Sequence, residues 1–170
     1  GTVGPETPTD EYPGNVFGGG KGYAQTFWCE KGMVYATKVS VSGATVNGSV
    51  YGGGELGRVE TNTEVKIGPE SGNAATKING NVFGAGQGSE THGYSALVRG
   101  NTDVVVRNGA EVEQNVYGGG EIASVGKYSV DGNGMPYSLA NNGSGYCHVT
   151  IPGNTQIKGD IFGGGKGVNP

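Results

Sequence analysis

The sequence predicts an all-β fold in which short strands from successive units of the chain stack in register. The first observation is a six-residue motif that occurs five times and ends in Gly-Gly-Gly or Gly-Ala-Gly. The second is a stretch of alternating apolar and polar residues that follows four of the five copies. The third is the composition, because 37 of the 170 residues are glycine. Self-similarity at a nearly fixed period is typical of proteins that stack one small unit on the next.

The motif begins with Asn, Ser or Asp, followed by Val or Ile and then by Phe or Tyr. Its copies span residues 15–20, 49–54, 81–86, 115–120 and 160–165. Their first residues are therefore 34, 32, 34 and 45 positions apart. The glycines predict a tight corner, where the backbone takes a positive φ or approaches another backbone closely. Because Ala85 occupies the middle glycine position of the third copy, we expect the two flanking glycines to have the stricter role.

Two further strands complete each predicted unit. The longer one alternates apolar and polar residues over 63–67, a pattern typical of a half-buried strand. Equivalent stretches begin at Thr37, Thr102 and Cys147. A shorter strand precedes the next motif and is centred on Val46, Ile78, Val112 and Ile157.

Three short strands cannot bury a core alone, whereas stacked units bury a continuous column of Val, Ile and Thr. The predicted fold class is therefore a right-handed parallel β-helix, or β-solenoid, of four to five rungs with three short strands per rung. The right hand follows from the strong preference of parallel crossover connections. A propeller of the kelch kind is the alternative, but its blades need about 50 residues and four strands, and the shortest unit here has 32 residues.

The chain divides into a short leader and one domain. Residues 1–13 hold three prolines and no periodic apolar pattern, so we expect a linker or leader there. Residues 14–170 form the predicted solenoid domain. Unit length varies only between the glycines and the longer strand, which places loop insertions at 22–35, 88–99 and 122–145. Insertions on one face are where repeat proteins usually build binding surfaces.

The composition excludes some partners. The formal net charge is −4 and no cluster of Lys and Arg is present, so we expect no nucleic-acid partner. No apolar stretch approaches the roughly 18 residues of a membrane span.

The five motif copies and the Thr-x-Val-x-(Ile/Val) strands resemble the glycine-rich, pectate-lyase-like parallel β-helix repeat modules of bacterial surface proteins, notably those of Bacteroidales. The resemblance covers residues 14–165 and concerns architecture rather than activity. It implies a secreted or cell-surface setting and a non-catalytic structural or binding role in a larger protein. Adhesion and carbohydrate binding are the implied uses, with a glycan or a host or cell-surface protein as partner. Polysaccharide-active lyases and glycoside hydrolases share this fold, so an enzyme fragment of that class is the alternative.

The candidate binding residues are aromatic. One ring recurs in each unit, at Phe17, Tyr51, Phe83, Tyr117 and Phe162. If alternation continues through the motif, these rings face outward and form a sugar-binding groove, because an aromatic ring presents a large apolar surface. If the glycine corner shifts the alternation, the rings lie inside the fold or beneath the inserted loops. The residues that we predict to contact a ligand are Tyr51, Phe83 and Tyr117, with Trp28 and Tyr94 from the insertions.

No residue pattern predicts a catalytic site, a metal site or a cofactor. Residues 52–57 match G-x-G-x-x-G, but a dinucleotide site needs a helix after the glycines and a strand pattern follows instead. The Cys and His residues lack the paired spacing of metal ligands. Glu55 and Glu121 each follow a glycine run, and Glu64 and Asp103 occupy equivalent strand positions. We interpret these acids as a solvated face, with a calcium site as the alternative.

The cysteines and the C-terminal residues complete the predictions. We expect two unpaired thiols, with Cys147 buried, because Cys29 lies about three units away and a disulfide needs Cα atoms within about 7 Å. Residues 160–170 begin a fifth unit without an alternating strand. An uncapped solenoid end exposes strand edges, so we expect either a continuing chain or end-to-end self-association.

Overall fold

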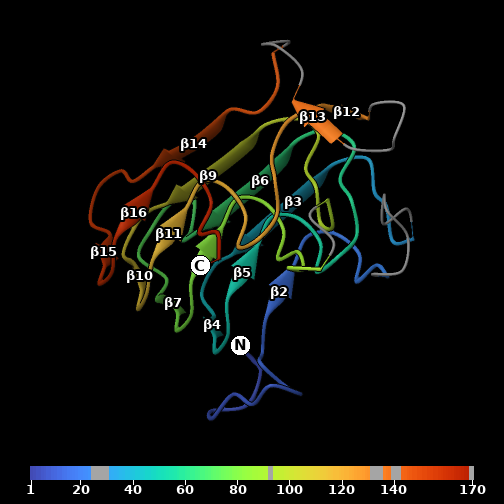
Figure 1. Ribbon diagram of the computed structural model, residues 1–170. Coiled ribbons are helices and arrows are strands. Elements are labelled where there is room, and N and C mark those ends of the chain that lie inside the picture. Colours follow the sequence, from blue (N-terminus) through green and yellow to red (C-terminus); the bar gives the residue numbers. More distant parts are fainter. Residues whose placement is uncertain (24–30, 92–93, 131–135, 139–142, 169–170) are drawn as a thin grey trace.

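The computed structural model of this chain describes residues 1–23, 31–91, 94–130, 136–138 and 143–168. Within these residues the chain is all-β and has no helix, and so none that is long and apolar enough to cross a membrane. Most strands lie in three parallel sheets, in which strands far apart in the sequence run side by side (Figure 1). The prediction of an all-β fold with stacked parallel strands is confirmed.

The three sheets are named here by their strands. The short-strand sheet contains, in spatial order, β1 (Thr2–Val3), β4 (Thr45–Val46), β7 (Thr76–Ile78), β10 (Ala110–Val112) and β15 (Gln156–Ile157). The aromatic sheet contains β2 (Val16–Phe17), β5 (Val50–Tyr51), β8 (Val82–Phe83), β11 (Val116–Tyr117) and β16 (Ile161–Phe162). The long-strand sheet contains β3 (Thr37–Val41), β6 (Thr63–Ile67), β9 (Thr102–Val106) and β14 (Cys147–Thr150).

The first four units each contribute one strand to each sheet in turn, and the fifth contributes β15 and β16. After β4 the chain passes through β5 and β6, and it then returns to the short-strand sheet as β7. The spatial order of the strands in every sheet follows their order along the chain, so each inner unit packs between the units that precede and follow it. In the aromatic sheet, successive pairing joins Val16, Val50, Val82, Val116 and Ile161.

Val, Ile and Ala residues from all three sheets pack into one core. In β6, Thr63, Val65 and Ile67 are buried, whereas Glu64 and Lys66 are half-exposed, as the alternation predicts. The buried members of the core are Val39, Val41, Val46, Val50, Val65, Ile67, Ile78, Val82, Val104, Val106, Ala110, Val112 and Val116. Because every strand is short, the core exists only through contacts between units.

The glycine corner is set by close approach between units. A Cβ atom on Gly84 would overlap the carbonyl oxygen of Gly118, which is the equivalent glycine of the next unit. The middle position is also crowded, since a Cβ on Gly53 would lie 2.6 Å from the amide nitrogen of Gly86. At the same position the Ala85 methyl packs in a small buried cluster with Val59 and Val98. The flanking glycines are still the more crowded ones, as the sequence predicts, because a Cβ atom on Gly84 or Gly86 would lie closer to a backbone oxygen than one on Gly53 lies to the Gly86 nitrogen.

Two ladders of side-chain hydrogen bonds also join the units. In one, the Oδ1 atom of Asn81 accepts a bond from the Asn115 N–H at 3.0 Å, and Asn115 accepts one from the Asp160 N–H at 2.7 Å. In the other, the hydroxyls of Thr37, Thr63 and Thr102 donate to carbonyl oxygens of the glycine corners, each at 2.5 Å. A buried acceptor without a partner is costly, so these bonds favour the observed register.

The third insertion leaves and re-enters the stack at neighbouring points. It contains an antiparallel pair, β12 (Tyr128–Val130) and β13 (Pro136–Ser138). The chain departs after Gly126 and returns at Gly145, and a Cβ on Gly126 would lie 3.3 Å from the Gly145 Cα atom. Val125, just before this insertion, still forms a parallel β-bridge with Val98. This bridge continues a series that joins Val34 to Val59 and Val59 to Val98.

Two sequence-based expectations need adjustment. Residues 1–13, predicted as a linker or leader, include β1, which pairs with β4 in the short-strand sheet. Cys147 is a free thiol, as predicted, but it is half-buried rather than buried. The reason is that β14 is the last strand of its sheet, so no further strand covers it. Cys29 lies outside the described residues.

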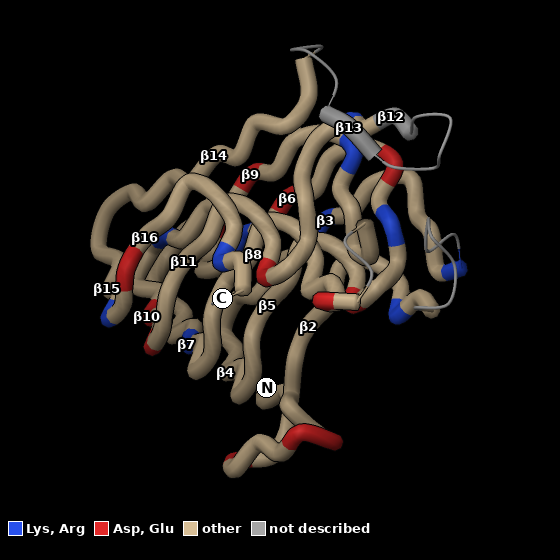
Figure 2. Tube along the Cα trace, viewed as in Figure 1, with Lys and Arg blue, Asp and Glu red and all other residues tan. Residues whose placement is uncertain are grey.

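A network of charges runs along the outer side of the short-strand sheet, where acidic and basic residues follow one another across β7, β10 and β15 (Figure 2). Lys158 Nζ lies 2.7 Å from a Glu111 carboxylate oxygen and 2.8 Å from a Glu113 oxygen. Lys77 Nζ lies 2.6 Å from Glu113 on its other side. Hydrogen bonds from Lys158, and then from Lys77, lower the pKa of Glu113 to about 2.

We expect this network to give an acid-dependent stability. Glu113 has an ordinary pKa of 4.5 and a pKa of about 2 in the fold. Because the folded pKa is the lower one, the stabilisation is present above about pH 4.5 and is lost as the pH falls toward 2. Thermal unfolding midpoints across this window should show wild type losing its advantage over Glu113→Gln as the pH falls. Glu70→Gln is the control, since Glu70 is largely exposed and pairs with Arg107 at 3.3 Å. A constant difference between wild type and Glu113→Gln would contradict the prediction.

Candidate functional site

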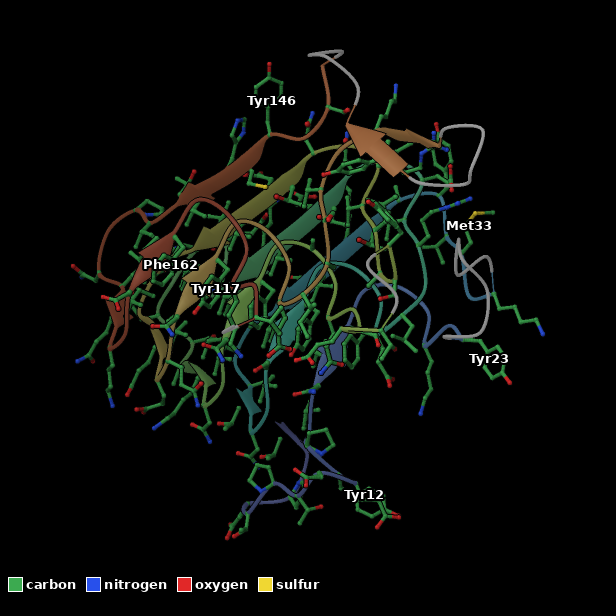
Figure 3. All side chains as sticks on the ribbon, in the orientation of Figure 1. Tyr12, Tyr23, Met33, Tyr117, Tyr146 and Phe162 are labelled. Atoms are coloured by element: carbon green, nitrogen blue, oxygen red, sulfur yellow. The ribbon has the colours of Figure 1, made fainter. Side chains whose placement is uncertain are left out.

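The aromatic residue of each unit forms a continuous stack, here called the aromatic ladder. Its rings are Phe17, Tyr51, Phe83, Tyr117 and Phe162, and Figure 3 labels the last two. Neighbouring ring centroids lie 4.7 to 4.9 Å apart, with interplanar angles of 7° to 12°. The ladder forms a cluster of its own, separate from the Val and Ile core.

The three central rings are buried. Tyr51, Phe83 and Tyr117 are 3%, 0% and 6% exposed, so the open outward groove that simple alternation predicts is not formed. Both faces of each central ring are occupied by the neighbouring rings. A sugar packs against the face of an aromatic ring, and these three residues have no face left for it. Only the end rings, Phe17 and Phe162, have one face that no other ladder ring covers.

Of the two predicted loop residues, Tyr94 does not join the ladder. Tyr94 packs edge-to-face against Tyr128, with ring centroids 5.7 Å apart. Burial, and then the neighbouring Tyr128, raises the pKa of Tyr94. Trp28 lies outside the described residues. The structure therefore brings together Tyr51, Phe83 and Tyr117 and places Tyr94 in a different pair.

A polar column follows the glycine corner in each unit and consists of Lys21, Glu55, Gln87, Glu121 and Lys166. Lys166 Nζ lies 2.8 Å from Glu121, and Lys21 Nζ lies 4.0 Å from Glu55. The Tyr51 hydroxyl donates a hydrogen bond to Glu121 at 2.7 Å, which ties the ladder to this column. Burial, and then Glu121, raises the pKa of Tyr51, so this phenol stays protonated and remains a donor.

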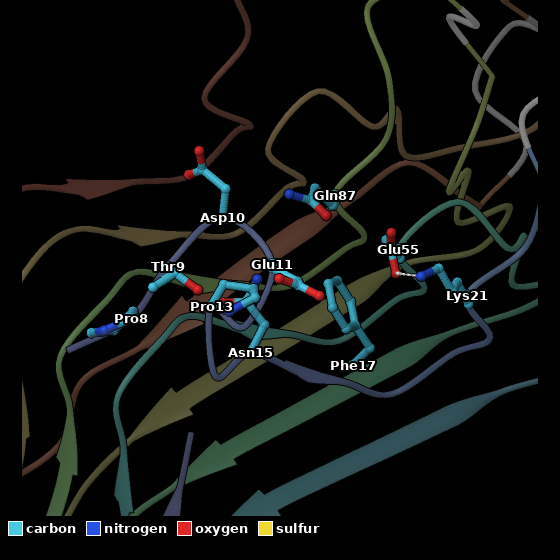
Figure 4. Close-up of a pocket in the computed structure, with 10 residues that line it drawn as sticks. All are labelled: Pro8, Thr9, Asp10, Glu11, Pro13, Asn15, Phe17, Lys21, Glu55 and Gln87. Carbon is cyan, nitrogen blue, oxygen red and sulfur yellow. Dashed lines mark ion pairs between the residues drawn. The ribbon is translucent and has the colours of Figure 1, made fainter. Parts of the chain in front are cut away.

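A hollow of about 530 Å³ lies where the ladder begins, and we call it the Phe17 cup (Figure 4). The segment from Pro8 to Pro13 forms one wall of the cup. The other residues that line it are Asn15, Phe17, Lys21, Glu55 and Gln87. The cup thus combines a half-buried ring with two amides, an ammonium group and the carboxylates of Asp10, Glu11 and Glu55. Such groups exchange hydrogen bonds with hydroxyls, while the ring supplies an apolar surface.

Sequence reasoning found only part of this cup. The position of Phe17 in the ladder was predictable from the motif. The acids of residues 8–13 were not, because that segment has no repeat pattern. Tertiary contacts hold the residues just before it, because the Asn47 side chain donates hydrogen bonds to the carbonyl oxygens of Gly4 and Pro5 at 3.0 and 2.8 Å.

A second hollow, of about 590 Å³, lies over the outer side of the long-strand sheet near Thr37, Asn62 and Asp103. Glu64 and Asp103 are cross-strand neighbours there, as the sequence predicts. Glu64 also pairs with Lys66 and with Lys38, the latter at 3.2 Å. The hydrogen bond from Lys66 is the main cause of the lowered pKa of Glu64.

The geometry of the Phe17 cup supports binding through polar groups beside one aromatic ring, whereas the residues that line the second hollow are Thr, Asn, Ala and charged side chains. Within the described residues, no group of three His, Cys, Asp or Glu side chains is placed to hold a metal ion. No family model, curated protein or solved structure matches this chain.

Proposed function

We propose that this chain is a non-catalytic module of a larger bacterial surface protein, located outside the cell, with a structural and glycan-binding role. One observation carries the proposal: the residues that recur in every unit contact the neighbouring units. The Asn side chains bond the next unit, the rings stack on each other, and the threonine hydroxyls bond the glycine corners. The repeat therefore encodes a scaffold, and variation is confined to the loops and the ends.

The proposed scaffold is a right-handed parallel β-solenoid. Three parallel sheets whose strands follow chain order support it. A fourth line of contacts, the parallel bridges through Val34, Val59, Val98 and Val125, adds a further support between the aromatic and long-strand sheets. The right hand is the one that parallel crossovers strongly favour.

We assign glycan binding to the Phe17 cup rather than to the central rings. Phe17 is half-buried and stacks on another ladder ring through one face only, whereas the central rings use both faces. Asn15, Gln87 and Glu55 lie in the same cup and supply hydrogen-bond donors and acceptors. Adhesion to a glycan-coated surface is the use that this combination fits.

A glycan array tests the assignment. We expect wild type to bind a defined set of glycans, and Phe17→Ala to lose most of that binding. The matched control is Phe162→Ala, which removes the ring at the other end of the ladder and should leave glycan binding unchanged. Circular dichroism establishes that each variant is folded.

Three outcomes would change the proposal. Binding that survives in Phe17→Ala would remove the cup as the site. If wild type binds no glycan, the binding role fails and a spacer role is left. Release of new sugar ends from a bound polysaccharide would instead support the lyase or hydrolase alternative.

A further inference from the structure

The Phe17 cup carries more negative than positive charge. Three carboxylates line it, those of Asp10, Glu11 and Glu55, and the single ammonium group of its lining belongs to Lys21. Three negative charges and one positive charge give the cup a formal charge of −2 at neutral pH, whereas the whole chain has a formal charge of −4. The excess negative charge of the chain is therefore concentrated at the proposed binding site.

A tight bend in residues 9–12 places two of these carboxylates on the wall of the cup. The Thr9 N–H donates to the Tyr12 carbonyl oxygen at 3.3 Å, and the Tyr12 N–H donates to the Thr9 hydroxyl at 3.1 Å. Asp10 and Glu11 are the two central residues of this bend, and both are exposed. A proline on either side of the bend restricts the backbone and lowers the entropy that the segment loses on folding. The local sequence thus presents both acids at one place.

The two acids of the bend are available to a ligand. Within the described residues, neither Asp10 nor Glu11 forms an ion pair. Glu55 does pair with Lys21, but the Lys21 Nζ atom lies 4.0 Å away and the lysine side chain is 83% exposed. An exposed pair of this kind contributes little and is easily exchanged. A cation that enters the cup therefore meets two unpaired carboxylates and one weakly paired carboxylate.

The cation that suits this arrangement is an organic ammonium group rather than a metal ion. The whole lining of the cup belongs to the described residues, and among these no three acids are placed to hold a metal ion. An ammonium group has three donors and needs fewer acceptors around it than calcium does. It is also attracted to the face of an aromatic ring. Figure 4 shows the Glu11 carboxylate beside the Phe17 ring, so both kinds of contact are offered together.

We propose that the glycan bound by the Phe17 cup carries a protonated amine, as an amino sugar without an N-acetyl group does. The ammonium group binds between the Glu11 carboxylate and the Phe17 ring, while Asn15 and Gln87 exchange hydrogen bonds with the sugar hydroxyls. The same carboxylates repel uronic acids and sulfated sugars, so the cup selects its ligand by charge. This inference rests on the proposed glycan-binding function and adds the chemical class of the sugar.

Isothermal titration calorimetry with three short oligosaccharides tests the proposal. The probes are a glucosamine trisaccharide, its N-acetylated counterpart and a galacturonic acid trisaccharide, at a mildly acidic pH where amines are protonated and carboxylates are ionised. We expect wild type to bind the glucosamine probe about five- to tenfold more tightly than the N-acetylated probe, and the galacturonic acid probe most weakly. Raising salt from about 0.05 M to about 0.5 M should remove most of this preference, because exposed charges are screened.

Glu11→Gln separates the effect of charge from that of shape. It should weaken binding of the glucosamine probe about three- to fivefold, because the amide has the size of the carboxylate but not its charge. Binding of the N-acetylated probe should stay unchanged. The matched control is Glu6→Gln, which makes the same change in net charge at an exposed residue that does not line the cup. Circular dichroism verifies the fold of both variants.

The possible failures can be told apart. Equal affinity of wild type for the glucosamine and N-acetylated probes would overturn the inferred class of sugar and leave glycan binding by the cup in place. Equal losses from Glu6→Gln and Glu11→Gln would also overturn it, because the attraction would then come from the net charge of the whole protein. If wild type binds none of the three probes, the inference fails, and an empty glycan array would in addition remove the binding function itself.

Discussion

Alanine in place of Gly84 is expected to destabilise the protein by about 3 kcal/mol or more, the upper end of the cost of overpacking. The added Cβ atom would overlap the carbonyl oxygen of Gly118 and lie 3.0 Å from the Thr102 Cβ atom. The backbone cannot simply move away, because the Gly84 N–H donates to the Tyr117 carbonyl at 2.9 Å. Urea unfolding measures the loss, which is a large part of the total stability of a typical domain.

Gly163→Ala is the matched control for this prediction. It makes the same chemical change at the same motif position, where a Cβ atom meets nothing within 4 Å. It should leave the free energy of unfolding nearly unchanged. Equal losses at the two positions would show that backbone freedom, rather than crowding between units, explains the glycines.

Truncation of the central ladder ring is expected to have the other large effect. Phe83 is fully buried and stacks on Tyr51 and Tyr117 at 4.8 and 4.9 Å. Phe83→Ala should therefore cost about 3 to 5 kcal/mol, as for other buried phenylalanines. Two terms contribute to this loss of stability. The burial of the Phe83 ring is lost, and a cavity is left between the rings of Tyr51 and Tyr117.

Phe162→Ala is the comparison for the ladder. Phe162 is 42% exposed, and Tyr117 is the one ladder ring that it stacks on, so we expect roughly half the loss or less, in proportion to the smaller buried area. Chemical denaturation of both variants and of wild type gives the two differences. A loss at Phe83 no larger than that at Phe162 would mean that stacking within the ladder does not stabilise the fold.

The sequence was sufficient to predict the strands and their register. Alternation over residues 63–67 and the repeated motif are local patterns, and each is read directly from neighbouring positions. Equivalent positions of the motif pair with each other in neighbouring strands. Val50, for example, pairs with Val82, as predicted. The all-β class and the register of the parallel strands follow from such patterns because successive units repeat the same contacts.

The burial of side chains was harder to predict, because it depends on neighbours that alternation does not specify. Tyr51 belongs to a cluster separate from the apolar core, yet it is buried because rings stack on both of its faces. Cys147 takes the place of a buried threonine but is half-buried, because its strand is the last in the sheet. The Phe17 cup depends on residues 8–13, which have no repeat pattern from which their position could be predicted.

The adjacency of Gly126 and Gly145 has a consequence for engineering and for evolution. The intervening 18 residues, 127–144, begin and end at neighbouring points of the stack. The number of residues in this insertion therefore does not affect how the stacked units pack. A foreign peptide whose ends are close together could be grafted between these two glycines without a change in the spacing of the layers. The scaffold can therefore acquire new surface chemistry at this corner while its internal architecture stays constant.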